Sequence, residues 1–285
     1  SNPKKLKVVI DASNGMAGKW VPIIFGDLNI KIIPLNFKCT GTFTHDPNPL
    51  VEANLAELKK KVVEKKAHLG ICFDGDADRL VVVDEKGKTV GCDILTALLA
   101  GFFLEKSPGA TVLYDLRSSR VVPEEIVKFG GRPRRERVGH AFMKKTLKDT
   151  KGVFGGELSG HFYYRDNFFA DSGMITLVYL LNILSANKTP LSELVAPLQR
   201  YASTGEINFE VEDKEAMMEQ LAQKYSDAEI DHLDGVTVQY SDWWFNCRPS
   251  NTEPLLRLNV EAENKKLLTE KSNELKALLG EPVDH

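Results

Sequence analysis

Short apolar runs alternate with longer amphipathic stretches along the first two thirds of this 285-residue chain. The runs at Val8–Asp11, Leu69–Phe73 and Thr111–Tyr114 are rich in β-branched and other apolar residues, which is typical of buried strands. Between the first two of them, Leu55–Lys66 carries apolar residues at helical spacing among its lysines. This alternation of strands and helices predicts an α/β fold.

The last third of the chain has a different pattern, in which strand-like runs outnumber helices. The predicted strands are Glu206–Val211, Gly235–Tyr240, Trp243–Arg248 and Leu255–Glu261, and the predicted helices are Lys214–Lys224 and Lys265–Leu279. Earlier in the chain a strand followed by a polar turn recurs, which predicts two related α/β domains with mixed sheets. We therefore expect an α/β domain over residues 1–90, a second over residues 91–202 and a smaller α+β C-terminal domain over residues 203–285.

Composition and charge exclude several classes of protein. The hydrophobic fraction of 42% and the charged fraction of 27% are those of a globular protein, and the net charge of −3 argues against a general nucleic-acid binder. No run reaches the roughly 18 apolar residues that a membrane span requires. The four cysteines form no CxxC pair and Cys72 lies in an apolar run, so buried thiols and a reducing, cytoplasmic compartment are expected.

Three aspartates alternate with small residues in the loop that follows Leu69–Phe73. The small spacers let the chain turn, so the carboxylates of Asp74, Asp76 and Asp78 can converge, and they would repel one another unless a cation lay between them. Oxygen ligands of this kind select Mg²⁺ or Ca²⁺, and the adjacent Arg79 is placed to engage a phosphate bound to the same ion. A solvated acidic turn is the alternative for such a loop.

Two other kinds of protein carry similar acidic loops but match this one less well. An EF-hand requires Gly at the sixth position, where this chain has Arg79, and the following Leu80–Val83 is strand-like. Phosphatases of the haloacid-dehalogenase type place an Asp-x-Asp motif after a strand, but the second residue beyond that motif is normally Thr or Val rather than Asp78. The EF-hand is rejected, and the phosphatase stays as the weaker alternative.

The glycine-rich segment GGELSGH offers donors and acceptors suited to a polyhydroxyl ligand. Glu157 accepts hydrogen bonds, Ser159 donates and accepts them, and His161 donates, so neighbouring sugar hydroxyls would find paired partners. Asp166 and Asn167 are further candidates for the same contacts. A polar turn without a ligand is the alternative reading of both segments.

The segment RPSNTEP, between two predicted strands, has the composition of an anion-binding loop. Arg248 supplies a guanidinium, Ser250 and Thr252 supply hydroxyls, and Asn251 supplies an amide. Prolines at both ends restrict the loop and so lower the cost of ordering it on binding. A plain hairpin turn is the alternative.

Other polar residues give weaker signals. Arg117 and Arg120 flank two serines just beyond Thr111–Tyr114, and an arginine-rich stretch leads into His140. Such a stretch is usually a solvated face. His140 follows a glycine and can exchange protons near neutral pH, so it is a candidate general acid or base.

The segments DGDADR, GGELSGH and RPSNTEP occur in the order and at the spacing of the α-D-phosphohexomutases, and the chain resembles the bacterial phosphomannomutase/phosphoglucomutase group of that superfamily. DASNGMAG, HDPNP, DLRSSR and RVGH are similar to segments of the same group. The resemblance covers essentially all 285 residues. It implies a mutase that interconverts hexose 1-phosphates and 6-phosphates through a phosphoserine and a bisphosphorylated sugar.

The resemblance also implies a role for each candidate residue. Mg²⁺ would be held by Asp74, Asp76 and Asp78. Catalysis would use Arg79 and Arg117 beside the transferring phosphoryl group and His140 as general acid or base, with a hexose 1,6-bisphosphate as activator. Mannose or glucose 1- or 6-phosphate would be bound by Glu157, Ser159, His161, Arg248, Ser250, Asn251 and Thr252. No nucleic-acid or membrane partner is expected.

The phosphoserine loop of that group, of the type TASHNP, has no counterpart among these residues. Ser13 lies in a different motif and is not expected to be the nucleophile. The resemblance therefore predicts a truncated, catalytically incompetent fragment that comprises domains two to four, with the N-terminal domain as its natural partner. A non-catalytic sugar-phosphate-binding protein is the alternative, and mannose and glucose are not distinguished because they differ only at the 2-hydroxyl.

Overall fold

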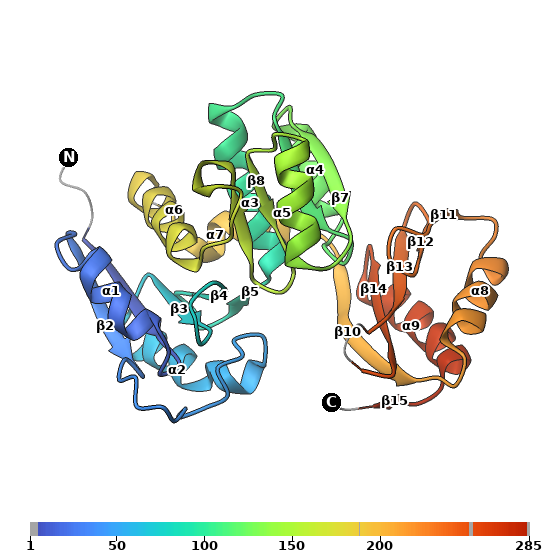
Figure 1. The fold of residues 1–285 in the computed structure, drawn as a ribbon, viewed down its shortest axis with the longest axis horizontal. Coiled ribbons are helices and arrows are strands. Elements are labelled where there is room, and N and C mark those ends of the chain that lie inside the picture. The colour runs from blue at the N-terminus through green and yellow to red at the C-terminus, as the bar shows by residue number, and fades with distance from the viewer. Residues whose placement is uncertain (1–4, 188, 251–252, 284–285) are drawn as a thin grey trace. The chain divides into compact units, whose positions relative to one another are not determined.

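The computed structural model describes residues 5–187, 189–250 and 253–283, and the chain divides into two compact units (Figure 1). The first unit comprises Ser1–Arg135 and Gly139–Leu198, and the second comprises Glu136–Val138 and Gln199–His285. The first predicted α/β domain and most of the second lie in the first unit, whereas residues 136–138 and 199–202 belong to the second unit. The division of the chain at residues 90/91 and 202/203 stays a prediction.

The first sheet of the first unit has five strands in the order β2-β1-β3-β4-β5. β1 (Leu6–Asp11) pairs in parallel with both β2 (Ile30–Leu35) and β3 (Leu69–Phe73), whereas β4 (Leu80–Asp84) returns antiparallel to β3 and is followed by β5 (Thr89–Val90). Every residue of β3 is buried, which explains its unbroken apolar sequence. The connecting helices of this sheet are α1 (Ala17–Phe25), the 3₁₀ turn Glu52–Leu55 and α2 (Ala56–Glu64).

The second sheet repeats this arrangement on a smaller scale, in the order β7-β6-β8-β9. β8 (Phe154–Gly156) pairs in parallel with β6 (Thr111–Asp115), and β9 (Phe162–Tyr164) returns antiparallel to β8. The edge strand is β7 (Arg132–Glu136), and the helices are α3 (Cys92–Lys106), α4 (Val121–Lys128), α5 (His140–Asp149), α6 (Gly173–Ala186) and α7 (Leu191–Val195). The shared strand pattern confirms two related α/β domains with mixed sheets.

The arginine-rich stretch before His140 has a structure that the sequence pattern did not predict. Arg132–Glu136 forms β7, although its first three residues are exposed as a solvated face would be. An edge strand pairs on one side only, so charged side chains are tolerated there.

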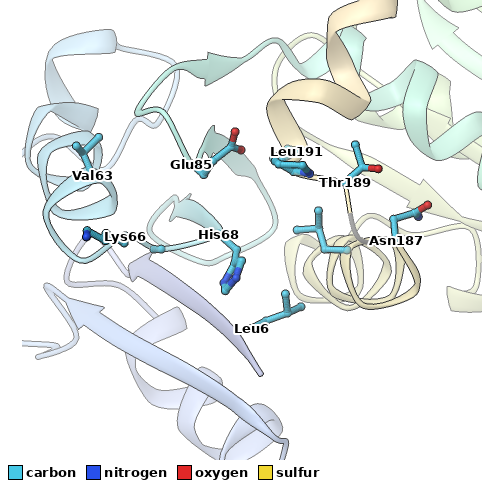
Figure 2. A pocket seen from close by; sticks show the side chains of 11 residues that line it. Leu6, Val63, Lys66, His68, Glu85, Asn187, Thr189 and Leu191 are labelled. Carbon is cyan, nitrogen blue, oxygen red and sulfur yellow. The ribbon is translucent and has the colours of Figure 1, made fainter. Parts of the chain in front are cut away.

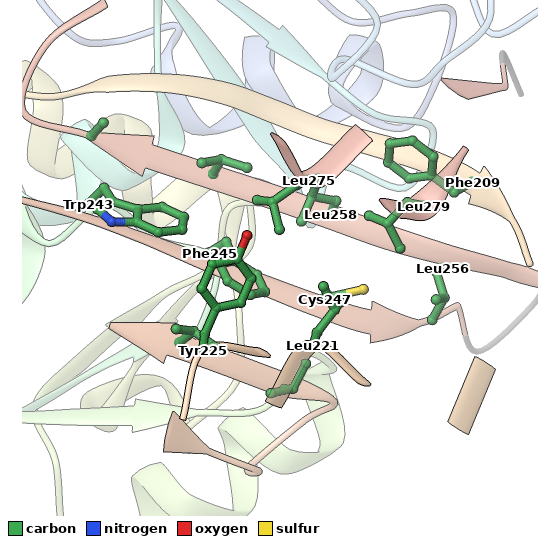
Figure 3. Packing of buried hydrophobic residues seen from close by; sticks show 14 residues of the cluster. Phe209, Leu221, Tyr225, Trp243, Phe245, Cys247, Leu256, Leu258, Leu275 and Leu279 are labelled. Carbon is green, nitrogen blue, oxygen red and sulfur yellow. The ribbon is translucent and has the colours of Figure 1, made fainter. Parts of the chain in front are cut away.

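The second unit is an antiparallel sheet with two helices, in the strand order β11-β12-β13-β14-β10-β15. Its strands are β10 (Ala202–Glu210), β11 (Glu229–Asp231), β12 (Val236–Gln239), β13 (Trp243–Pro249), β14 (Leu255–Ala262) and β15 (Pro282–Val283), and its helices are α8 (Lys214–Lys224) and α9 (Lys265–Leu279). Alternate residues of β13, among them Phe245 and Cys247, pack against leucines of β14 and α9 (Figure 3). The predicted α+β C-terminal domain is confirmed.

Among the described residues, no helix combines the length and the apolar character that crossing a membrane requires.

Candidate functional site

The acidic loop begins directly after β3, and the structure brings its three aspartates together. Asp74, Asp76 and Asp78 each offer a carboxylate oxygen, and these oxygens lie within 4.8 Å of one another. Ala77 between them has a left-handed backbone, with φ of 68°, which turns the chain tightly enough for this convergence. Three converging hard oxygen donors fit Mg²⁺ or Ca²⁺. The structure therefore supports the grouping that the sequence predicted, while the bound ion stays a prediction.

Asp74 is the buried member of this group, with 3% of its surface exposed. Burial raises the pKa of its carboxyl group, and Asp78 nearby raises the pKa further. Arg79 opposes this effect, because its Nε lies 2.7 Å from Oδ2 of Asp74 and its backbone N–H donates to Oδ1 at 3.2 Å. Arg79 is thus held against Asp74 by two contacts, while its contact with a phosphoryl group stays a prediction.

The sugar loop, which we define as residues 155–161, is joined to the acidic loop by main-chain and side-chain contacts. The amide of Leu80 donates to the carbonyl of Gly160 at 3.1 Å, and Arg79 forms an isolated β-bridge with His161. His161 Nε2 lies 3.6 Å from Oδ2 of Asp78 and holds the pKa of that carboxyl group down to about 2. Burial by itself lowers the pKa of His161, but Asp78, together with Glu157 and Asp171, more than offsets it, and the net shift is upward. The two predicted loops therefore form one polar cluster.

Ser159 and Asp171 complete the surroundings of His161. Ser159 Oγ lies 3.0 Å from Nδ1 of His161, and Oδ2 of Asp171 lies 3.9 Å from Nε2. Lys144 on α5 pairs with the other oxygen of Asp171 at 2.8 Å. The sequence pattern did not single out Asp171 or Lys144. Asp171 lies two residues before Gly173, the first residue of α6.

Glu157 is held deep in the sugar loop, with 2% of its surface exposed. Its carboxylate accepts hydrogen bonds from the hydroxyl of Tyr163 and, at 3.3 Å, from the amide of Gly139. Burial raises the pKa of Glu157, and the negative charge of Asp115 raises it further. These two donors leave further lone pairs of the carboxylate for a ligand hydroxyl.

Asp115 links the sugar loop to the DLRSSR segment and was not predicted as a site residue. It is fully buried, and its Oδ2 accepts hydrogen bonds from the amide of Leu158 and from Nη2 of Arg117, both at 2.7 Å. Its Oδ1 accepts from the amide of Arg117 at 2.8 Å. Its position in the sequence could have indicated this role, since Asp115 is the last residue of β6 just as Asp11 is the last residue of β1.

His140 is the first residue of α5 and is exposed. The preceding Gly139 has φ of 133°, and its amide donates to Glu157, so His140 begins its helix beside the sugar loop. By contrast, Asp166 and Asn167 lie in a 3₁₀ turn beyond the opposite end of β9. Asn167 donates to the carbonyl of Ala170 at 3.4 Å, as expected for the turn alternative.

The predicted phosphate loop lies in the second unit, between β13 and β14. Arg248 is 2% exposed, and its Nη2 lies 2.9 Å from Oε2 of Glu206. Arg257 pairs with both Glu206 at 3.2 Å and Glu253 at 2.7 Å. Ser250 is buried, and its Oγ accepts from the amide of Glu253 at 3.2 Å. The two remaining candidates, Asn251 and Thr252, lie outside the described residues.

A cavity of about 320 Å³ lies at the other end of the first sheet (Figure 2). It is lined by Leu6 and His68, at the amino ends of β1 and β3, and by Leu191 at the start of α7. Glu85, the acidic residue of its lining, is already bound to the amide and hydroxyl of Ser192. None of the candidate site residues that the structure describes lines this cavity.

Sequence models of one family match nearly the whole chain, in the order that the fold suggests. They are the phosphoglucomutase/phosphomannomutase α/β/α domain II over residues 1–87, α/β/α domain III over residues 92–201 and the C-terminal domain over residues 206–277. The chain belongs to the phosphoglucomutase/phosphomannomutase family.

Individual members of the family are similar over the same span. A phosphomannomutase from Methanocaldococcus jannaschii is 39% identical over 275 residues, which are 96% of this chain and 61% of the relative. A phosphohexose mutase from Xanthomonas campestris pv. campestris is 38% identical over 98% of this chain and 63% of its own length. The crystal structure of a phosphoglucomutase/phosphomannomutase family protein from Burkholderia thailandensis has a TM-score of 0.90 and 32% identity, covering 97% of this chain and 60% of that one. The chain thus spans about three fifths of the length of these relatives.

Proposed function

We propose that this chain supplies the metal-, sugar- and phosphate-binding parts of a phosphohexose mutase that interconverts the 1- and 6-phosphates of mannose or glucose. The observation that carries the proposal is the joining of the acidic loop to the sugar loop through Asp78 and His161. Phosphoryl transfer requires charge compensation at the phosphate and a positioned sugar, and this cluster offers groups for both. The similarity to phosphomannomutases over nearly the whole chain supports the same reaction.

In this proposal each predicted residue keeps its role. Asp74, Asp76 and Asp78 hold Mg²⁺, which when bound neutralises charge on the transferring phosphoryl group. Arg79 and Arg117 lie at the carboxyl ends of β3 and β6 and add positive charge, and His140 exchanges the proton of the reacting hydroxyl. The sugar hydroxyls bind to Glu157, Ser159 and His161, and the non-reacting phosphate binds to Arg248, Ser250, Asn251 and Thr252.

The nucleophile is proposed to lie outside these 285 residues, since none of them forms a TASHNP-type loop. Ser13 is 1% exposed and donates its hydroxyl hydrogen to the carbonyl of Phe73, so it is not available to carry a phosphate. The chain alone therefore binds a hexose 1,6-bisphosphate but does not turn substrate over, and a phosphoserine-bearing domain is its partner. Four free cysteines fit a reducing, cytoplasmic setting.

Two measurements on this chain test the proposal. Titration calorimetry with glucose 1,6-bisphosphate and Mg²⁺ should show binding that weakens at least about tenfold in Asp74→Asn. Adding a separately produced polypeptide that carries a TASHNP-type phosphoserine should restore conversion of mannose 1-phosphate or glucose 1-phosphate. Binding that is unchanged in Asp74→Asn would contradict the metal role. Release of inorganic phosphate by the chain alone, lost in Asp74→Asn, would favour the phosphatase alternative instead.

A further inference from the structure

We propose that Ser13 and the turn around it are positioning elements that hold Asp74 in the direction a cation requires. This turn, residues 11–18, runs from the last residue of β1 into the start of α1 and lies beside the acidic loop that follows β3. Ser13 Oγ donates to the carbonyl of Phe73 at 2.6 Å, and the amide of Met16 donates to the carbonyl of Gly75 at 2.9 Å. The carbonyl that directly precedes Asp74 and the carbonyl of Gly75, the next residue, are therefore held by residues that lie about sixty positions earlier in the chain.

The turn is itself fixed by a buried carboxylate. Asp11 is fully buried and accepts hydrogen bonds from the amide of Ser13 at 2.9 Å and from the side chain of Asn36 at 3.0 Å. Its second oxygen lies 3.1 Å from Nε2 of His45. Ser13 and Asn14 both have left-handed backbones, with φ of 48° and 53°, a conformation that non-glycine residues keep only where surrounding contacts compensate for its cost.

Gly15 shows how closely the two loops approach. A Cβ atom built at this position would lie 2.4 Å from the carbonyl oxygen of Gly75, so any side chain would displace the acidic loop. Gly15 is not among the residues with positive φ, so contact with Gly75 and not backbone conformation is the reason for glycine. A Cβ atom on Gly26, at the end of α1, would likewise lie 2.4 Å from a carbonyl oxygen, that of Pro22, which is part of neither the turn nor the acidic loop.

Displacing the carbonyl of Phe73 or of Gly75 would shift the backbone that directs the carboxylate of Asp74 toward Asp76 and Asp78. Metal ligands depend on such outer contacts, and their loss typically weakens metal binding by 10- to 100-fold. The inference rests on the proposed metal site, and it assigns a function to the DASNGMAG segment that the proposed roles did not include. Ser13 and Gly15 are expected to act through the acidic loop without touching substrate.

The test is a titration of the whole chain with Mn²⁺, followed by electron paramagnetic resonance, which measures metal binding without any turnover. Ser13→Ala and Gly15→Ala should each weaken Mn²⁺ binding by about tenfold. Two matched variants control for lost stability. Ser272→Ala removes another buried serine hydroxyl, from α9, and Gly26→Ala introduces a comparable backbone clash at the end of α1, outside the turn. Both controls should bind Mn²⁺ as the unchanged chain does, even where their melting temperatures fall as far.

The outcomes separate this inference from the proposed function. If the unchanged chain binds Mn²⁺ in a manner that Asp74→Asn abolishes, the metal site stands. Equal affinities of Ser13→Ala, Gly15→Ala and the two controls would then overturn the positioning role alone. If Asp74→Asn has no effect on Mn²⁺ binding, the metal site fails and the positioning role fails with it.

Discussion

Replacing Tyr163 by Phe removes the one side-chain hydroxyl that the structure shows donating to Glu157. Both residues are buried, with exposures of 0% and 2%, so water cannot readily replace the lost donor. The amide of Gly139, at 3.3 Å, would be left as the remaining donor recorded for this carboxylate. Because a buried carboxylate is costly without hydrogen bonds, the substitution should lower the free energy of unfolding of the first unit.

The size of the loss depends on the charge of Glu157 and hence on pH. A buried hydrogen bond to a charged group contributes roughly 1.5–3 kcal/mol, and one between neutral groups about 1 kcal/mol. Burial holds the pKa of Glu157 above its usual value in the folded protein, so the folded state binds this proton more tightly than the unfolded state. The stability that this preference contributes is fully present below the pKa that Glu157 has in the unfolded chain. It is lost as the pH rises through the higher pKa of the folded protein. Tyr163 favours the ionised form, so Tyr163→Phe should cost about 1 kcal/mol at pH 5 and about 2 kcal/mol at pH 8.

Urea unfolding followed by circular dichroism at both pH values would measure these losses. Tyr164→Phe is the matched control, because Tyr164 is also buried but its hydroxyl pairs with the neutral hydroxyl of Thr176. Its cost should be about 1 kcal/mol at either pH. If the two variants lose the same stability at pH 5 and pH 8, Glu157 does not ionise in the way described and the reasoning is refuted.

Three further substitutions or reactions test other features of the fold. Ellman's reagent at pH 8 should label the exposed Cys39 quickly and no other thiol before unfolding, because burial raises the pKa of the remaining three cysteines to about 12. A second thiol that reacts quickly would contradict this expectation. Gly235→Ala should destabilise the second unit by about 2–4 kcal/mol in urea unfolding, because φ is +69° and the added Cβ would lie 2.2 Å from the carbonyl oxygen of Cys247. Phe168→Asn should leave stability unchanged or raise it by about 0.5 kcal/mol, since Phe168 is 94% exposed and left-handed, and a clear loss in the same assay would reveal packing that the fold does not show.

Elements with a strong local pattern were predicted from the sequence with their bounds. Leu69–Phe73, Lys214–Lys224 and Lys265–Leu279 are observed as β3, α8 and α9 with the predicted ends. A continuously buried strand has an unbroken run of apolar residues. A helix is recognised from its length and from the Asp or Asn cap that precedes it, as in α8 and α9. β2 and β7 were not predicted, because an edge strand with a proline or several arginines lacks the apolar pattern of a buried one.

The members of the candidate site were largely visible in the sequence, because acidic, glycine-rich and anion-binding loops have distinctive compositions. Their contacts were not visible. Each key contact joins loops that follow different strands. Examples are the approach of His161 to Asp78, the hydrogen bond from Leu158 to Asp115 and the hydrogen bond from Ser13 to Phe73. Local composition predicts which side chains a loop carries, whereas strand pairing across long separations in the chain decides which loops meet and how deeply each carboxylate is buried.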